Sequence, residues 1–268
     1  MSRPATDGRI VQEFHPGAST ATPLNVAYRL GKLRGLGLLK GRWLDFGCAD
    51  GAYTAAMVEL GAESAVGIDT AAERIEAARA GLAHNQKLAF ACSDGGTIPF
   101  PHDSFDGAFM NEVLEHVTDE QAALRELRRV IRPGGHLVVI SPNRGFPFEC
   151  HGAHIGRFQL RFPVPLLPWL PSRIGQRFMN ARNYRPGEMR DLIARQGFEV
   201  QSVGFVWPVL DHYRWIPARL RPLYQRHISW FDATAGIRRL GLSVLVVARK
   251  PAQDNVAFQD QGGPIERR

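Results

Sequence analysis

Apolar and polar residues alternate along the chain with two different periods between residues 42 and 249. Short apolar runs predict buried strands, and longer segments with apolar residues three or four positions apart predict helices. Strands are expected at residues 43–46, 64–68, 88–92, 105–110, 136–141, 198–203 and 242–249. Helices are expected at residues 24–39, 53–60, 71–83, 118–131 and 187–196. This order predicts an α/β fold, a doubly wound and mostly parallel seven-stranded sheet with helices on both faces.

One long segment, residues 143–183, interrupts this alternation and is rich in proline and aromatic residues. It follows the fifth strand, so it should lie at the carboxyl edge of the sheet, where ligands bind. Because long irregular loops in compact domains are usually functional, we expect an inserted lid; the alternative is an insertion that packs on itself. The domain itself should cover residues 24–250. A flexible arm is expected at residues 1–23, and a disordered tail at residues 251–268.

Composition and charge limit the setting and the partners. The chain has 268 residues and a net charge of +7, and residues 141–240 hold 15 Arg, no Lys and 6 acidic residues. Only 4 lysines accompany 29 arginines in the whole chain, which is typical of codon bias, so nucleic acid is not the expected partner. The sequence lacks an apolar leader, a run of about 20 apolar residues and paired cysteine spacing, which predicts a cytoplasmic location.

A glycine-rich turn, DFGCADG at residues 45–51, follows the first strand. In dinucleotide-binding enzymes such a turn carries G-x-G-x-x-G and faces a pyrophosphate. Here Asp45 and Asp50 place carboxylates close to that position, where they would repel pyrophosphate and attract the ammonium group of a methionine moiety. Asp69, at the end of the second strand, can accept hydrogen bonds from the ribose hydroxyls of an adenosyl ligand. Capping of the next helix is the alternative role for Asp69.

Several blocks of sequence, in the right order, resemble class I S-adenosylmethionine-dependent methyltransferases of the methyltransferase type 11-like family. The blocks are residues 43–52, 67–69, 93–95, 98–106, 111–117, 132–135 and 197–200. The resemblance covers roughly residues 40–250 and implies that S-adenosyl-L-methionine is the cofactor. It also implies a Rossmann-like methyltransferase fold.

Carried over by position, the resemblance implies a cofactor site at the ends of the first four strands. The amino group would be held by Asp45, the ribose by Asp69 and the adenine by Asp94. The cofactor-binding residues implied in this way are Asp45, Gly47, Cys48, Gly51, Asp69, Thr70, Asp94, Gly95 and Asn111. Ala49 stands where the family usually has glycine. Its Cβ is tolerable if φ is negative, so we expect a slightly altered loop geometry.

Candidate catalytic groups follow the fourth strand and recur in the lid. Transfer of a methyl group to a hydroxyl needs an aligned nucleophile and a base or metal that generates oxyanion character. His116 is the candidate base, with Glu115 beside it, although His116 could instead have a purely structural role. His151 adds a titratable group from the lid, among aromatic residues suited to a small or lipophilic acceptor.

A divalent metal is an alternative for the same segment. The spacing Glu112-x-x-Glu115-His116 resembles the metal-binding run of ubiquinone-pathway O-methyltransferases and small-RNA 2′-O-methyltransferases. Two carboxylates and an imidazole suit Mg²⁺, Mn²⁺ or Zn²⁺, and Glu149, His151 or His154 could complete the set. The same run is frequent in family members without a metal, so no metal ligand is assigned.

The sequence therefore predicts an S-adenosylmethionine-dependent methyltransferase acting on the hydroxyl of a small or lipophilic metabolite, such as a quinone, polyketide, sugar or lipid-linked compound. One alternative is an RNA methyltransferase that uses the arginine-rich half. A nucleotide-dependent oxidoreductase is the other alternative, and the loop carboxylates argue against it. Residues 162–170, flanked by Arg161 and Arg173, could contact a membrane surface transiently, although ordinary packing on the sheet is the simpler interpretation.

Overall fold

The computed structural model describes residues 22–93, 96–160, 163–209 and 219–252. Nearly all of the expected arm and tail lie outside these residues, as do Asp94 and Gly95. Among the described residues, no helix is long and apolar enough to cross a membrane.

A seven-stranded sheet forms the centre of the molecule, in the order β10-β11-β5-β4-β1-β2-β3. The strands are β1 (Arg42–Phe46), β2 (Ser64–Asp69), β3 (Leu88–Cys92), β4 (Phe105–Asn111), β5 (Ile131–Pro142), β10 (Glu199–Val206) and β11 (Ser243–Arg249). Only β11 runs antiparallel to its neighbours; the other pairs are parallel. The predicted doubly wound, mostly parallel seven-stranded sheet is confirmed.

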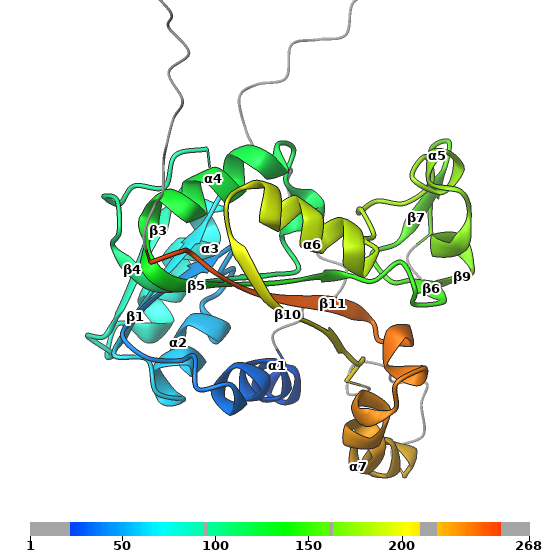
Figure 1. Ribbon diagram of the computed structural model, residues 1–268, viewed down its shortest axis with the longest axis horizontal. Coiled ribbons are helices and arrows are strands. Elements are labelled where there is room, and N and C mark those ends of the chain that lie inside the picture. Colours follow the sequence, from blue (N-terminus) through cyan, green and yellow to red (C-terminus); the bar gives the residue numbers. More distant parts are fainter. Residues whose placement is uncertain (1–21, 94–95, 161–162, 210–218, 253–268) are drawn as a thin grey trace, which may run out of the picture.

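Helices cover both faces of this sheet (Figure 1). On one face lie α1 (Pro23–Gly35), α2 (Ala52–Glu59) and α3 (Ala72–Leu82), and on the other lie α4 (Glu120–Val130) and α6 (Pro186–Arg195). Helix α4 shows the local logic. Asp119 caps it by accepting a hydrogen bond from the Ala122 amide, and Ala123, Leu124, Leu127 and Val130 form a fully buried stripe at helical spacing.

The fifth strand was expected at residues 136–141, so residues 133–135 were placed before it. These residues lie inside β5, which begins at Ile131, five residues earlier than expected. Gly134 has a φ of +81°, and its amide donates to the Lys250 carbonyl, so the strand continues through an irregular step. A glycine in a left-handed conformation serves a bulge as readily as a turn, and the sequence does not distinguish the two.

The lid segment, residues 143–183, folds into two small ribbons, β6 (Phe148–Glu149) with β9 (Val164–Pro165) and β7 (Ala153–Ile155) with β8 (Phe158–Leu160). The short helices η2 (Leu167–Trp169) and α5 (Ser172–Gly175) follow. Ala153, Leu167 and Met179 form a small core of its own. The segment follows the carboxyl end of β5; its action as a lid stays a prediction.

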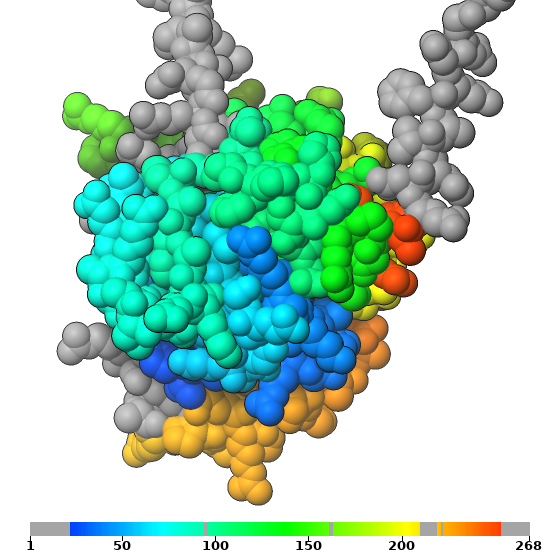
Figure 2. Space-filling model, turned by 90° about the vertical axis from the view of Figure 1, so that its left-hand side faces the viewer, coloured from blue at the N-terminus to red at the C-terminus, as the bar shows by residue number. Residues whose placement is uncertain are grey.

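Two further elements, α7 (Leu220–Ala233) and η3 (Ile237–Leu240), lie between β10 and β11 and were not expected. Pro222 lies in the first turn of α7, where no intrahelical hydrogen bond is lost. Seen from the left-hand side of Figure 1, segments coloured from blue to green cover most of the surface, and α7 lies beneath them in orange (Figure 2).

Candidate active site

The glycine turn after β1 needs glycine at two positions. Gly47 and Gly51 both have a φ of 82°, in the left-handed region that favours glycine. A Cβ at Gly47 would overlap the side chain of Val113, and one at Gly51 would lie 2.7 Å from the ring of Phe90. The turn is therefore packed directly against the segment that follows β4.

Ala49 departs from the expectation, because its φ is +50° and not negative. A left-handed conformation costs a residue with a Cβ about 1–2 kcal/mol. The Ala49 amide donates to Asp69 Oδ2 at 2.9 Å, and this hydrogen bond holds the turn in place. The loop thus keeps its conformation and stores strain at Ala49.

Asp69 connects the ends of two strands. Its Oδ2 accepts from the Ala49 amide, and its Oδ1 accepts from the amide of Ala71, the residue that precedes α3, at 3.0 Å. Asp69 and the adjacent Thr70 lie at the carboxyl end of β2, where a ribose was predicted to bind. Their contacts with a cofactor stay predictions.

Asp45 is a buried carboxyl group at the base of the turn, 2% exposed. Thr54 Oγ1 donates to its Oδ2 at 2.7 Å. Burial raises the pKa of Asp45 to about 7, although the hydrogen bond from Thr54 works in the opposite direction. A ligand ammonium beside Asp45 would favour its ionised form. Burial also raises the pKa of the Cys48 thiol far above its usual value, so this thiol stays neutral.

The predicted acceptor side begins where β4 ends, at Asn111. The next residue, Glu112, is buried and has a φ of +55°, unusual for a residue with a side chain. Arg29 of α1 donates from Nη1 to Asn111 Oδ1 at 2.5 Å and to Glu112 Oε1 at 2.8 Å. Ser243 of β11 also donates to Glu112 Oε1, at 2.6 Å. Burial alone would raise the pKa of Glu112, but the charge of Arg29 lowers it below its usual value.

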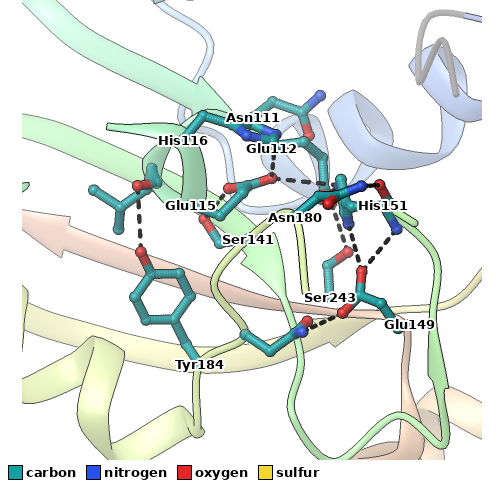
Figure 3. A network of polar contacts seen from close by, with 12 residues as sticks. Asn111, Glu112, Glu115, His116, Ser141, Glu149, His151, Asn180, Tyr184 and Ser243 are labelled. Carbon is teal, nitrogen blue, oxygen red and sulfur yellow. Dashed lines mark hydrogen bonds and ion pairs between the residues drawn. The ribbon is translucent and has the colours of Figure 1, made fainter. Parts of the chain in front are cut away.

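Glu115 lies on the single turn η1 (Leu114–His116) and is 3% exposed. Ser141 Oγ donates to its Oε2 at 3.0 Å, whereas its Oε1 is buried without a hydrogen-bond partner. Burial and the charge of Glu112 raise the pKa of Glu115 well above its usual value. Glu112 and Glu115 are thus two neighbouring carboxyl groups in opposite electrostatic conditions (Figure 3).

His151 reaches this pair from the lid. Its Nε2 lies 3.6 Å from Glu112 Oε2 and 3.6 Å from Glu115 Oε1, and its Nδ1 lies 3.7 Å from Glu149 Oε1. Burial alone would lower the pKa of His151, but Glu149, Glu115 and Glu112 raise it to about 9. Glu149 is itself fixed, because Asn183 Nδ2 donates to its Oε2 at 2.5 Å.

His116 faces the same point from η1. Its Nε2 lies 3.9 Å from Glu115 Oε1, and its ring centroid lies 5.7 Å from that of His151. Burial and the charge of His151 lower the pKa of His116 to about 4. An imidazole with such a pKa is neutral at neutral pH and is a weak base, but its nitrogen lone pair suits a metal.

Glu115, His116 and His151 have donor atoms that all lie within 4.8 Å of one another. Bonds of about 2.0–2.2 Å to one ion bring its ligand atoms to within about 3–4 Å of each other, so a small inward movement would suffice. Glu115 Oε1, buried and unsatisfied, fits this use. Two imidazoles and one carboxylate favour Zn²⁺ or Mn²⁺ over Mg²⁺, which prefers oxygen ligands.

The structure thus brings together the predicted catalytic residues Glu115, His116 and His151. Two other residues that had been considered as metal ligands already have hydrogen-bond partners. Glu112 Oε1 accepts from Arg29 and Ser243, whereas its Oε2 lies 3.6 Å from His151 Nε2. The Nδ1 atom of His154 pairs with Asn180 Oδ1 at 3.0 Å.

Sequence reasoning missed Arg29, which is 1% exposed. A signal for it existed. Arg29 and Asn25 lie on the same face of α1 as the buried residues Val26, Leu30 and Leu33, and polar residues on an apolar helix face need buried partners. Ser243 carried no such signal, because it begins an ordinary apolar strand.

The reversed β11 at one side of the sheet, the glycine turn after β1 and the carboxylate after β2 define a class I methyltransferase fold. Residues 44–139 match a family model described as a methyltransferase domain, and this part of the chain is such a domain. A crystal structure of an S-adenosylmethionine-dependent methyltransferase from Mesorhizobium loti has the same fold, with a TM-score of 0.56 and 20% identity over 84% of this chain and 97% of that one.

Curated relatives align with part of the chain. An O-methyltransferase from Pyrenophora dematioidea is 36% identical over 99 residues, which are 36% of this chain and 37% of that protein. A demethylmenaquinone methyltransferase from Clavibacter sepedonicus is 34% identical over 98 residues, 37% of this chain and 40% of that protein. The chain therefore spans less than half the length of these relatives.

Proposed function

We propose that this protein transfers a methyl group from S-adenosylmethionine to a hydroxyl group of a small or lipophilic acceptor. The observation that carries this proposal is the cluster of Glu115, which is buried, with His116 and His151, which are partly buried. Glu115 and His116 follow β4 shortly after Val113, which packs against the glycine turn. In the reaction the methyl group moves from the sulfonium to the acceptor oxygen, and the hydroxyl proton must leave. A titratable cluster at this position suits the removal of that proton.

The names of the two curated relatives both describe methyl transfer, and one of them specifies an oxygen acceptor. One is named an O-methyltransferase and the other a demethylmenaquinone methyltransferase. The described part of the lid adds aromatic side chains such as Phe146 and Phe148, whose ring centroids lie 5.8 Å apart. Quinones, polyketides, sugars and lipid-linked compounds are the acceptor classes that we propose to test.

The proposal includes a divalent cation held by Glu115, His116 and His151. Such an ion supplies Lewis acidity, which lowers the pKa of a hydroxyl group bound to it. The surrounding residues support His151 as a ligand, because Glu149 contacts its second ring nitrogen and Asn183 fixes Glu149. Without a cation, the same three side chains would have to accept the proton.

The test is release of S-adenosylhomocysteine across a panel of hydroxylated metabolites, together with the metal content of the purified protein. We expect acceptor-dependent release that a chelator lowers about 100-fold and that Zn²⁺ or Mn²⁺ restores better than Mg²⁺. Full activity in chelator, with no metal bound to the protein, would remove the cation from the proposal. Absence of S-adenosylhomocysteine binding in calorimetry would overturn the proposal as a whole.

A further inference from the structure

Exposed apolar side chains are concentrated in two segments of the chain. Of the 14 large apolar side chains that are exposed among the described residues, 11 belong to the lid or to α7 and η3. The lid exposes Phe148, Ile155, Phe158, Leu166, Trp169, Leu170 and Ile174, and α7 with η3 exposes Leu220, Leu223, Trp230 and Leu240. Only Leu24, Leu36 and Val203 lie elsewhere. Single exposed apolar residues are normal, but gathering on two elements indicates an interaction surface.

The two segments leave the body of the domain at the same place. The lid begins after β5, and η3 precedes β11, which pairs with β5. Asn143 at the base of the lid donates to the Arg239 carbonyl at 2.8 Å and to the Gly241 carbonyl at 2.7 Å. In Figure 1 the lid lies above, and α7 below, the right-hand end of β11. The lid reaches the candidate site through His151, and Ser243, the first residue of β11 after η3, also contacts this site.

The exposed part of the lid is held in shape from within. Arg144 donates to the carbonyls of Pro168 at 3.1 Å and Leu170 at 2.7 Å, and also to Ser172 Oγ. Trp169 Nε1 donates to the Gly145 carbonyl, yet its side chain is 53% exposed. Leu166 has a φ of +59°, which strains its backbone, and it is 55% exposed. Packing of its side chain therefore does little to compensate for this strain. The turn therefore presents apolar side chains in a fixed arrangement.

The charges on these two segments have one sign. Among their described residues the only carboxylates are Glu149, which is buried, and Asp232, which binds Lys32 and Tyr28. Their exposed cationic residues are Arg157, Arg173, Arg177, Arg226, Arg238 and Arg239, and the exposed Arg219 directly precedes α7. An apolar surface interspersed with arginines complements a bilayer with anionic headgroups, which attracts each cation by about 1 kcal/mol. Two copies of the chain joined through this surface would instead bring arginines together.

We propose that the lid and α7 dock the domain on the surface of a bilayer that contains anionic lipids. Trp169, Leu166 and the apolar side chains of α7 enter the boundary between headgroups and acyl chains, and the arginines bind phosphate groups. The docked surface adjoins the candidate site, so an acceptor dissolved in the bilayer reaches the site without crossing water. This statement about the acceptor rests on the proposed function, whereas the docking itself does not.

The test is co-sedimentation of the full chain with vesicles of phosphatidylcholine, alone or mixed with phosphatidylglycerol, without cofactor or acceptor. We expect binding to the mixed vesicles that weakens as salt rises. The double variant Leu166→Ser/Trp169→Ala should lower the partition coefficient at least about tenfold, and Arg173→Gln/Arg177→Gln about tenfold at low salt. The matched control is Arg34→Gln/Leu36→Ser, exposed residues of the same types at the end of α1, which should change it less than about twofold.

Four outcomes would overturn the proposal: no sedimentation with either vesicle, equal losses in the control variant, self-association that the lid variants abolish, or RNA binding that the arginine variant abolishes. The last two would assign the surface to a second copy of the chain or to RNA. Failure of docking and failure of the proposed function are distinguishable, because vesicle binding is measured without turnover. Methyl transfer to a water-soluble acceptor should not change in the lid variants.

Discussion

The cofactor side and the acceptor side of the candidate site are built in different ways. The glycine turn, Asp45 and Asp69 come from consecutive elements, and backbone amides hold them, including those of Gly47 and Cys48, which both donate to the Ile68 carbonyl. The acceptor side gathers side chains from four places far apart in sequence: Arg29 from α1, Glu112 and Glu115 after β4, His151 from the lid and Ser243 from β11. Local backbone geometry determines how the cofactor side is built, and compensation of buried charge determines how the acceptor side is built.

The two sides also differ in charge. The cofactor turn holds one buried carboxyl group, Asp45, which Thr54 stabilises without an ion pair. The acceptor side buries three carboxyl groups, those of Glu112, Glu115 and Glu149, against the guanidinium of Arg29 and the imidazole of His151. Burial of a charge without compensation is costly, so the acceptor side favours either a proton on Glu115 or a bound cation.

The largest expected effect is a loss of turnover on the acceptor side without a change in binding on the cofactor side. Glu115→Gln should lower turnover by about 10²–10⁴-fold, because it removes the group that binds the cation or takes the proton. Affinity for S-adenosylhomocysteine should change less than about twofold in calorimetry. Glu76→Gln, at an exposed position on α3, is the control. Loss of cofactor binding in Glu115→Gln would show that the two sides are not independent.

The thermal stability of Glu115→Gln tests whether unfolding causes its loss of turnover. Burial and Glu112 raise the pKa of Glu115 in the folded protein above its usual value. A carboxyl group with a raised pKa favours folding at low pH, and this contribution is lost as the pH rises through the folded-state pKa. Glutamine keeps the neutral form at every pH, so the Tm of Glu115→Gln at neutral pH in chelator should not fall.

A smaller effect comes from pH on the cofactor side. Burial raises the pKa of Asp45 to about 7, so ligand binding near pH 6 requires loss of a proton that is already lost at pH 8. Affinity for S-adenosylhomocysteine should therefore rise roughly tenfold from pH 6 to pH 8. Isothermal calorimetry should give a flat profile for Asp45→Asn and an unaltered one for Glu115→Gln. If the pH dependence of affinity were lost in Glu115→Gln and kept in Asp45→Asn, Glu115 and not Asp45 would be the carboxyl group whose ionisation controls ligand binding.

The smallest effect concerns strain in the turn. Ala49→Gly should raise stability by about 0.5–1 kcal/mol, because relief of the left-handed conformation exceeds the added entropy of the unfolded chain. The expected gain in Tm is about 1–3 °C. Ala56→Gly, inside α2, should have the opposite sign. A lower Tm for Ala49→Gly would mean that the alanine methyl packs favourably and that the turn stores no strain.

Most of the sheet could be predicted from sequence because its signals are local. Strand β3 was expected at residues 88–92 and occupies them. Each of β1, β2 and β4 differs from its predicted range by one residue at one end. The ends of β5, β10 and α1 were less accurate. Strand pairing extended β5 to Ile131 and β10 to Val206, and pairing of this kind depends on residues far away in the chain.

The candidate site could be predicted only in part, for the same reason. Glu115, His116 and His151 were named from residue type and position, but their distances depend on how the lid folds back. The positive φ of Ala49 was not foreseen, because the carboxylate that fixes the Ala49 amide belongs to Asp69, 20 residues later. Arg29 and Ser243, which donate hydrogen bonds to Glu112, lie 83 and 131 residues from it in the sequence, so no local sequence pattern could predict these contacts.

Arg29 has a consequence for where this domain can be cut. Sequence similarity delimits a domain at residues 44–139, and excision at those limits would keep Glu112 and discard the guanidinium that neutralises it. Leaving a buried ion without its partner costs about 3–5 kcal/mol, comparable to the whole stability of many domains. The segment that sequence similarity recognises is therefore shorter than the segment needed to neutralise its buried charges. Any minimal version of this protein has to begin before α1.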